Sequence, residues 1–145
     1  MNLQIRKATQ DDYSDICALV NHELGYPDVD VRELSARLDM MAQDSNYCTF
    51  VALLDDKVAG FIGTAQGITF EANSGQMRII ALAVSGDYHK KGIGSALLKH
   101  AEAYAQSKGV TWLALNSGFR RVEAHMFYEN NGYIKKQYGF SKYIL

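Results

Sequence analysis

The amino-acid sequence predicts a mixed α/β fold, in which helices cover both faces of a central, mostly antiparallel mixed sheet. One observation is a run of β-branched and aromatic residues at 47–70, interrupted by turn residues in the manner of a hairpin. Another is a buried strand pattern at 77–84, followed by a glycine-bearing loop and a long amphipathic helix. A hairpin beside strand–helix–strand crossovers requires a mixed sheet. Because the chain has 145 residues and no linker, we expect a single domain spanning 1–145.

The chain is expected to begin with a strand and two helices. Residues 3–7 alternate apolar and polar side chains, which is typical of a short strand. Thr9 and Asp12 have the T-x-x-D spacing of a helix start, so Thr9 is the predicted N-cap. A second helix is expected to open at 28–30. Behind both starts apolar residues recur every three or four positions and should face the core. These residues are Tyr13, Ile16, Val20, Leu24, Val31, Leu34, Leu38 and Met41.

The middle of the chain is predicted to be strand-rich. The two hairpin strands are expected at 47–54 and 58–70, and a central strand buried on both faces at 77–84. The helix after the glycine loop should run to about 108, where Gly109 ends it.

The last third of the chain adds a strand, a helix and a final strand. The strand is expected at 110–115, the helix at 121–130 with Gly132 as its stop, and the aromatic tail 133–145 is predicted to be a strand. The predicted element order is therefore β-α-α-β-β-β-α-β-α-β.

Composition argues against several classes of protein. The chain has 15 Lys and Arg against 16 Asp and Glu, which gives no support to nucleic-acid binding through bulk charge. No stretch approaches 18 apolar residues and the N-terminus lacks a signal-peptide pattern, so we expect neither a membrane partner nor secretion. Cys17 and Cys48 lie in apolar segments without metal-ligand spacing, which predicts two reduced, buried thiols and no metal site. Together these features predict a cytoplasmic protein.

The segment 85–94 carries the most informative functional pattern. It joins a buried strand to a long helix, and Gly92 and Gly94 stand at the helix start. Backbone N–H groups at a helix start have no intrahelical partner, and the helix dipole favours an anion there. Two glycines let a phosphate approach these groups, and the His-Lys-Lys run at 89–91 adds donors suited to a pyrophosphate.

Other interpretations of this loop compete with a pyrophosphate site. The glycines alone would also permit a tight turn and close helix packing. A dinucleotide-binding fold would require a third glycine where Leu97 stands, and the first crossover of the chain. A P-loop is excluded because the sequence contains no G-x-x-x-x-G-K-[ST].

Two motifs connect the chain to a known family. Residues 89–94 read H-K-K-G-I-G, and residues 124–133 read A-H-M-F-Y-E-N-N-G-Y. The first resembles the [Q/R]-x-x-G-x-[G/A] pyrophosphate loop of the GNAT superfamily of acyl-CoA-dependent N-acetyltransferases. The second resembles the A-x-x-F-Y-x-x-x-G-[F/Y] helix of the same superfamily. The two motifs occur in the family's order with a strand between them, and the resemblance covers essentially all 145 residues.

The resemblance implies acetyl-CoA as the acyl donor and names the residues around it. Tyr128 stands where the family commonly has the general acid that protonates the departing CoA thiolate. Arg121, Ala124 and Tyr128 share one helical stripe, which favours a Tyr128 side chain that projects into a cleft. In the family a bulge and splayed strands near residues 82–84 provide backbone groups for the oxyanion and pantetheine. The implied acetyl-CoA contacts are Leu82, Ala83, Val84, His89, Lys90, Lys91, Gly92, Ile93, Gly94, Ser95, Arg121, Ala124 and Phe127.

Three positions depart from the family pattern. His89 stands where the family has Gln or Arg, and Arg121 stands where it often has Asn. Neither change removes the acyl-CoA site. Ile80 replaces a carboxylate that is frequent on the central strand, so the general base is not identified. The candidates are His22, Glu23, Glu71, His125 or a water molecule.

The implied function is transfer of the acetyl group to a primary amine by direct attack, without a covalent enzyme intermediate. The acceptor is not identified, and Glu23, Tyr26 and Glu71 are its candidate binding residues. The alternative is a non-catalytic acyl-CoA-binding sensor or partner module, which His89 and the missing strand carboxylate keep open. A dinucleotide-dependent oxidoreductase is a third class and would bind NAD instead. The aromatic tail favours a homodimer.

Overall fold

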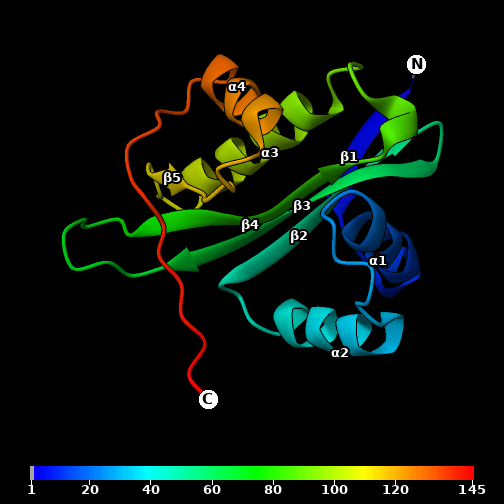
Figure 1. Ribbon diagram of the computed structural model, residues 1–145, viewed down its shortest axis with the longest axis horizontal. Coiled ribbons are helices and arrows are strands. Elements are labelled where there is room, and N and C mark those ends of the chain that lie inside the picture. The colour runs from blue at the N-terminus through cyan, green and yellow to red at the C-terminus, as the bar shows by residue number, and fades with distance from the viewer. Residues whose placement is uncertain (1) are drawn as a thin grey trace. The chain divides into compact units, whose positions relative to one another are not determined.

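The computed structural model describes residues 2–145 (Figure 1). It divides into two compact units, Met1–Ala114 and Leu115–Leu145. The first unit contains the sheet and most of the helices, and the second contains one α-helix. In chain order the elements are β1 (Leu3–Lys7), the 3-10 helix η1 (Gln10–Asp12), α1 (Tyr13–His22), α2 (Val31–Ala42), β2 (Tyr47–Leu54), β3 (Lys57–Gly67), β4 (Gln76–Val84), the 3-10 helix η2 (Gly86–Tyr88), α3 (Ile93–Ser107), β5 (Leu113–Ala114) and α4 (Val122–Asn130).

The sheet has five strands in the order β1-β2-β3-β4-β5. The first three pairings are antiparallel, and β4 pairs with β5 in parallel. The parallel pairing requires a crossover, which α3 supplies between β4 and β5. The predicted mixed, mostly antiparallel sheet with helices on both faces is therefore confirmed.

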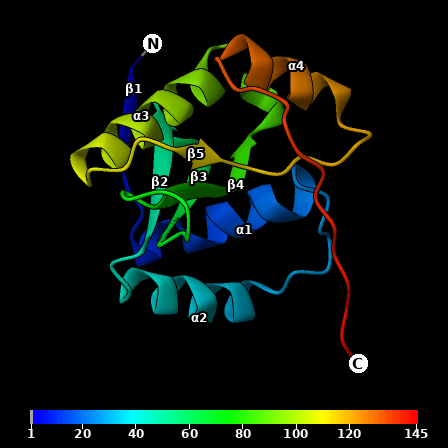
Figure 2. The same cartoon turned by 90° about the vertical axis from the view of Figure 1, so that its left-hand side faces the viewer.

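In the first unit the sheet separates two layers of helices, with α3 on one face and α1 and α2 on the other (Figure 2). Alternate side chains of β2 pack against the helices on opposite faces of the sheet. The Phe50 ring meets the rings of His100 and Tyr104 in α3, with centroids 4.6 and 5.2 Å apart. The next residue, Val51, packs instead in a core cluster with Ile16 of α1.

The two N-terminal helices bury the predicted stripe almost completely. Tyr13, Ile16 and Leu38 are buried, and the other members pack half-buried against them. Val31 is the exception. It is 42% exposed because it is the first residue of α2 and lies at the outer end of the buried stripe.

The predicted N-cap at Thr9 starts a turn of 3-10 helix, η1, before α1 begins. The Asp12 carboxylate accepts the Thr9 N–H at 2.8 Å, which completes a capping box. It also pairs with both terminal nitrogens of Arg6, at 2.7 and 3.0 Å. Asp12 is 4% exposed, and hydrogen bonding from Arg6 lowers its pKa. This buried carboxylate therefore ties β1 to the start of α1.

A β-bulge interrupts β4. The register between β3 and β4 slips between Gly63 and Thr64 and leaves Ile80 without a partner in β3. An extra residue moves the following side chains to the opposite faces of the sheet. Met77, before the bulge, packs against residues of α3, whereas Ala83, after it, packs with α1 and α2.

Two predicted strands are shorter in the structure. β3 ends at Gly67 and not at 70, because Ile68 and Phe70 lie fully exposed in the loop that follows. β5 contains only Leu113 and Ala114.

The predicted strand at 133–145 is absent, and this segment has no regular secondary structure. Its apolar side chains, among them Tyr138 and Phe140, are exposed, so no buried face holds it as a strand. None of the helices within residues 2–145 is long and apolar enough to cross a bilayer.

Candidate active site

The chain passes from β4 to α3 through a loop that the sheet holds at its start. The N–H of Ser85 donates to the carbonyl oxygen of Ala59 in β3, at 2.8 Å. The Ser85 hydroxyl then caps η2 by accepting the N–H of Asp87 at 3.4 Å. After η2, Lys90 and Gly92 both take left-handed backbone angles, with φ of 65° and 77°. These two residues turn the chain into α3.

Gly92 is the N-cap of α3 and leaves the helix start open. Its carbonyl accepts the N–H of Ala96 at 3.0 Å, so the N–H groups of residues 93–95 come before the first α-helical donor. A Cβ on Gly92 would meet no atom within 4 Å. The open side of the helix start and the positive end of the dipole together suit an anion such as a phosphate.

The His-Lys-Lys run lies on the surface before this helix start. Lys90 and Lys91 are exposed, and the His89 side chain is 59% exposed. The His89 Nε2 lies 3.1 Å from the carbonyl oxygen of Val84 at the end of β4. The loop therefore presents two ammonium groups next to Gly92, while the imidazole lies against the strand.

The second half of β4 turns backbone groups away from β3. In an antiparallel strand, every second residue directs its N–H and C=O groups to the same neighbouring strand. The Ser85 N–H points at β3, so the backbone groups of Leu82 and Val84 point away from β3. On that side β5 pairs only with Met77 and Arg78. The bulge expected from the family resemblance lies at Ile80, just before these residues. The peptide groups of Leu82 and the N–H of Val84 thus face away from β3 next to the loop, whereas the Val84 carbonyl oxygen contacts His89.

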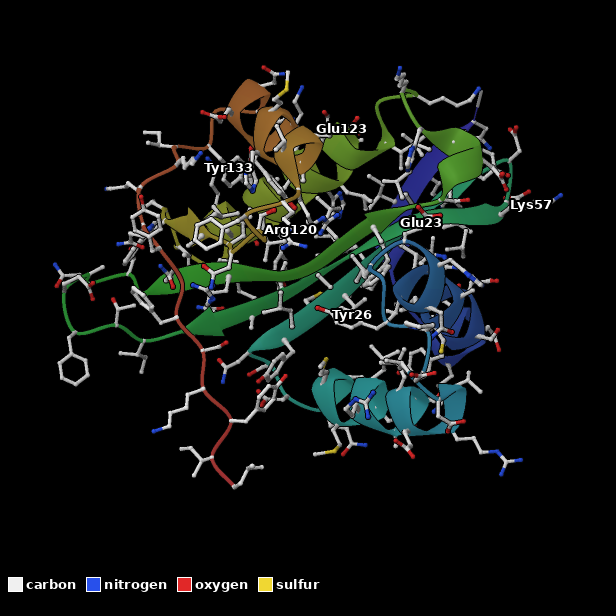
Figure 3. The ribbon with its side chains drawn as sticks, in the orientation of Figure 1. Glu23, Tyr26, Lys57, Arg120, Glu123 and Tyr133 are labelled. Carbon is white, nitrogen blue, oxygen red and sulfur yellow. The ribbon has the colours of Figure 1, made fainter. Side chains whose placement is uncertain are left out.

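Glu23 connects the end of α1 to this loop. One carboxylate oxygen accepts the Gly86 N–H at 3.0 Å, and the other lies 3.8 Å from the His89 Nε2. Figure 3 shows Glu23 at the end of α1, next to the turn that follows β4. Of the three candidate acceptor-binding residues, Glu23 thus contacts the loop between β4 and α3.

Tyr26 lines a surface hollow of about 380 Å³ in the connection between α1 and α2. The Tyr26 side chain is 59% exposed, and its carbonyl accepts from the Asn21 side chain at 2.8 Å. The hollow is also lined by three acidic residues and one arginine, which are Asp28, Asp30, Glu33 and Arg37. The Asp30 carboxylate caps α2 by accepting the N–H groups of Arg32 and Glu33, both at 3.1 Å.

Glu71 lies at the other end of the sheet. It is exposed in the loop between β3 and β4, before Gln76, whereas the loop that leads into α3 follows Val84 (Figure 1). The intervening strand is roughly 25 Å long at about 3.3 Å per residue. The structure therefore does not bring Glu71 together with the loop before α3.

The second unit contains the other predicted site residues, on or beside α4. Arg121 is the N-cap of α4, and Ala124, Phe127 and Tyr128 are half-buried along it. Tyr128 lies between the rings of Phe127 and Tyr133, with centroids 5.3 and 6.0 Å away. Burial raises the pKa of the Tyr128 phenol, and the charge of Arg121 opposes the shift. At neutral pH the phenol is protonated, as an ordinary tyrosine also is and as a general acid must be.

None of the four candidate bases stands out in the structure. The His125 Nε2 lies 2.8 Å from the carbonyl oxygen of Gly118, and the Glu23 carboxylate accepts the Gly86 N–H. Glu71 lies at the far end of β4, and His22 is exposed at the end of α1.

The predicted buried thiols are confirmed, since Cys17 and Cys48 are both free and buried. Burial raises the pKa of the Cys48 thiol, which makes it a poor nucleophile. Within residues 2–145 no group of three or more His, Cys, Asp and Glu side chains is arranged to hold a metal ion.

Comparison with known proteins identifies the family. The family model described as "Acetyltransferase (GNAT) family" matches residues 5–133. The chain belongs to the GNAT acetyltransferase family. The aminoalkylphosphonate N-acetyltransferase of Salmonella typhimurium is 30% identical to it, over 96% of this chain and 90% of the relative. The chain is therefore an acyl-CoA-dependent N-acetyltransferase, and the resemblance seen in its motifs is confirmed.

Solved structures of GNAT acetyltransferases have the same fold. A GNAT family acetyltransferase of Staphylococcus aureus superposes with a TM-score of 0.82 at 27% identity, covering 99% of this chain and 100% of the other. The aminoglycoside N-acetyltransferase AAC(6')-Iy, solved in complex with CoA, superposes with a TM-score of 0.86 at 13% identity, covering 99% of this chain and 95% of the other. The similarity thus spans both units of the chain.

Proposed function

We propose that the chain transfers the acetyl group of acetyl-CoA to a primary amine, with the pyrophosphate of acetyl-CoA held at the start of α3. The observation that carries the proposal is Gly92, whose left-handed backbone leaves the helix N-terminus open next to Lys90 and Lys91. We further propose that both units form one catalytic domain, 1–145. The family match over residues 5–133, which crosses the boundary between the units, supports this.

Each part of the proposed site has a chemical task. The N–H groups at 93–95 and the lysines bind the pyrophosphate, and the peptide groups of Leu82 and Val84 bind pantetheine and the oxyanion, whereas those of Ala83 face β3. The residues Arg121, Ala124 and Phe127 border the cofactor from α4. The acceptor reacts as the neutral amine. As its nitrogen bonds to the acetyl carbon, the carbon–sulfur bond breaks and Tyr128 gives its proton to the thiolate. The nitrogen then releases its extra proton to water, and Tyr128 regains a proton from the solvent, so no dedicated base is needed.

The acidic hollow beside Tyr26 supports a cationic acceptor. Three acidic residues against one arginine give the lining of the hollow a net negative charge, which favours an ammonium group over an anion. We therefore propose an amine without an anionic group as the preferred acceptor. This differs from the substrate that the name of the Salmonella relative gives, an aminoalkylphosphonate, which carries a negatively charged phosphonate.

A thiol-release assay tests the proposal. The full chain is mixed with acetyl-CoA and either a diamine, a neutral amino sugar or an aminoalkylphosphonate, and free CoA thiol is followed with a colorimetric reagent. We expect amine-dependent thiol release, fastest with the diamine. A faster reaction with the phosphonate would exclude the hollow as the acceptor site but leave the transferase activity intact. CoA binding without thiol release from any amine would support the non-catalytic acyl-CoA-binding alternative.

We also propose a cytoplasmic location and a homodimer. Two free, buried thiols suit a reducing compartment. The exposed apolar side chains of the tail, which include Tyr138, Phe140 and Tyr143, support contact with a second copy. Sedimentation of the full chain and of a Phe140→Asp variant tests the dimer, which the variant should weaken.

A further inference from the structure

Glu23 is the C-cap residue of α1, a helix that is firmly packed into the first unit. Ile16 and Leu19 of α1 are 1% and 7% exposed in the core beneath the sheet. The Glu23 N–H donates to the carbonyl of Leu19 at 2.8 Å, so its backbone belongs to the helix end. The Glu23 side chain is 27% exposed. Because its backbone is fixed in this way, the Glu23 carboxylate can hold a loop in a fixed place.

The Gly86 N–H has no donor role inside η2, because it is the first residue of that 3-10 helix. Glu23 accepts this hydrogen at 3.0 Å, across 63 positions of sequence. The charged acceptor makes this hydrogen bond stronger than one between neutral groups.

His89 gives the same carboxylate a second neighbour on the other side of η2. The His89 Nε2 lies 3.8 Å from Glu23 and 3.1 Å from the carbonyl oxygen of Val84. Glu23 thus lies next to both ends of η2, at Gly86 and at His89. Three residues after His89 the chain reaches Gly92, so the position of η2 determines where the helix start opens.

These contacts give Glu23 a task besides the acceptor binding that the sequence suggests. One carboxylate oxygen accepts a backbone hydrogen of the loop and the other faces the His89 imidazole, so the side chain is directed at the loop. The neighbouring Asn21 instead holds the acceptor-side connection, through hydrogen bonds to the carbonyls of Tyr26 and Val29 at 2.8 and 3.1 Å.

We infer that Glu23 is a positioning residue for acetyl-CoA: it fixes η2 and His89 so that the start of α3 is open before the cofactor arrives. This role rests on the proposed function. Since the loop is pre-organised, loss of Glu23 should weaken acetyl-CoA binding and leave the chemical step of the bound complex nearly unchanged.

The test compares Glu23→Ala, Glu23→Gln and the control Asp15→Asn, an exposed carboxylate on the same helix. Glu23→Ala should raise the Kd for CoA and the KM for acetyl-CoA about tenfold, with kcat within about twofold. Glu23→Gln keeps an oxygen for the Gly86 N–H and should recover most of the affinity. Asp15→Asn should bind like the wild type. Wild-type affinity in Glu23→Ala, or a large loss of kcat at saturating acetyl-CoA, would overturn the positioning role.

Amide hydrogen exchange without cofactor supplies an independent readout. In Glu23→Ala, exchange at 86–91 should accelerate while the strands keep their protection. Unchanged exchange in this segment together with weaker CoA binding would mean that Glu23 touches the cofactor directly, and would overturn the inference. If the wild type itself fails to bind CoA, the proposed function fails, and the exchange result still shows whether Glu23 holds the loop.

Discussion

A Cβ on Gly60 would lie 2.8 Å from the carbonyl oxygen of Ala83, closer than side-chain atoms approach backbone. It would also press on Val84 and on Leu97 of α3, at 3.3 Å each. Glycine at this position of β3 therefore lets the last residues of β4 lie against α3. These last residues are the ones that we propose for binding pantetheine.

Gly60→Ala is expected to destabilise the protein by about 2 kcal/mol, because the neighbouring backbone must move. Gly67→Ala on the same strand is the control, since a Cβ there meets no atom within 4 Å. Thermal unfolding should show a lower midpoint for Gly60→Ala only, and CoA affinity should fall with it. Equal midpoints for the two variants would contradict the close approach.

Gly92→Glu should weaken CoA binding by about tenfold or more, because it adds a negative charge where the helix start meets the pyrophosphate. Gly109→Glu is a matched control. Its φ of 76° is nearly that of Gly92, 77°, and a Cβ at either position meets no atom within 4 Å. Both variants should lose about 1 kcal/mol of stability from left-handed strain. Titration calorimetry should show weaker CoA binding for Gly92→Glu than for Gly109→Glu. Equal CoA affinity of the two variants would show that the pyrophosphate does not bind at this loop.

Tyr128→Phe should lower kcat by about tenfold or more while the KM for acetyl-CoA stays nearly constant. Because burial raises the pKa of Tyr128, the wild-type rate should persist to pH values above the ordinary tyrosine range and fall only beyond it. Steady-state kinetics across pH measure both effects. Tyr138→Phe, an exposed tyrosine of the tail, serves as the control and should leave kcat unchanged. An undiminished kcat in Tyr128→Phe would exclude the phenol as the general acid.

Asp12→Asn should destabilise the fold by about 2 kcal/mol at pH 7, since Arg6 loses its charged partner. The folded-state pKa of Asp12 is lowered, so its stabilising effect is complete above the unfolded value of about 3.9 and is lost as pH falls through the folded value. The stability difference between wild type and variant should therefore shrink below about pH 4. Urea unfolding at several pH values measures it, and a difference that persists in acid would contradict the ion pair.

Local patterns in the sequence were sufficient for most of the fold. Helix stripes, the hairpin turn and the glycine stops depend on neighbouring residues, and the structure has them close to the predicted positions. The bulge at Ile80 was not predicted from the residues themselves, because an apolar strand shows no alternation that a bulge could interrupt. The tail at 133–145 has the composition of a strand, but strand formation also requires a partner edge, which composition does not reveal.

The glycine loop was predictable for a different reason. A turn into a helix start depends on residue types within a few positions, so Gly92 and its neighbours could be recognised directly. The contact between Glu23 and Gly86 joins residues 63 positions apart, and no local pattern contains it. The sequence singled out Glu23 by its charge and position near the helix end, but its partner depends on how α1 packs under the sheet.

Thermal unfolding of the full chain with and without acetyl-CoA tests the central claim most directly, with NAD as the control ligand. At about 100 times its Kd, a ligand that binds only the folded state adds roughly 2.7 kcal/mol of stability, which raises the midpoint by several degrees for a chain of this size. A shift with acetyl-CoA and none with NAD is the predicted result. An unchanged midpoint with acetyl-CoA would contradict the account and leave the glycines at 92 and 94 as residues of a turn.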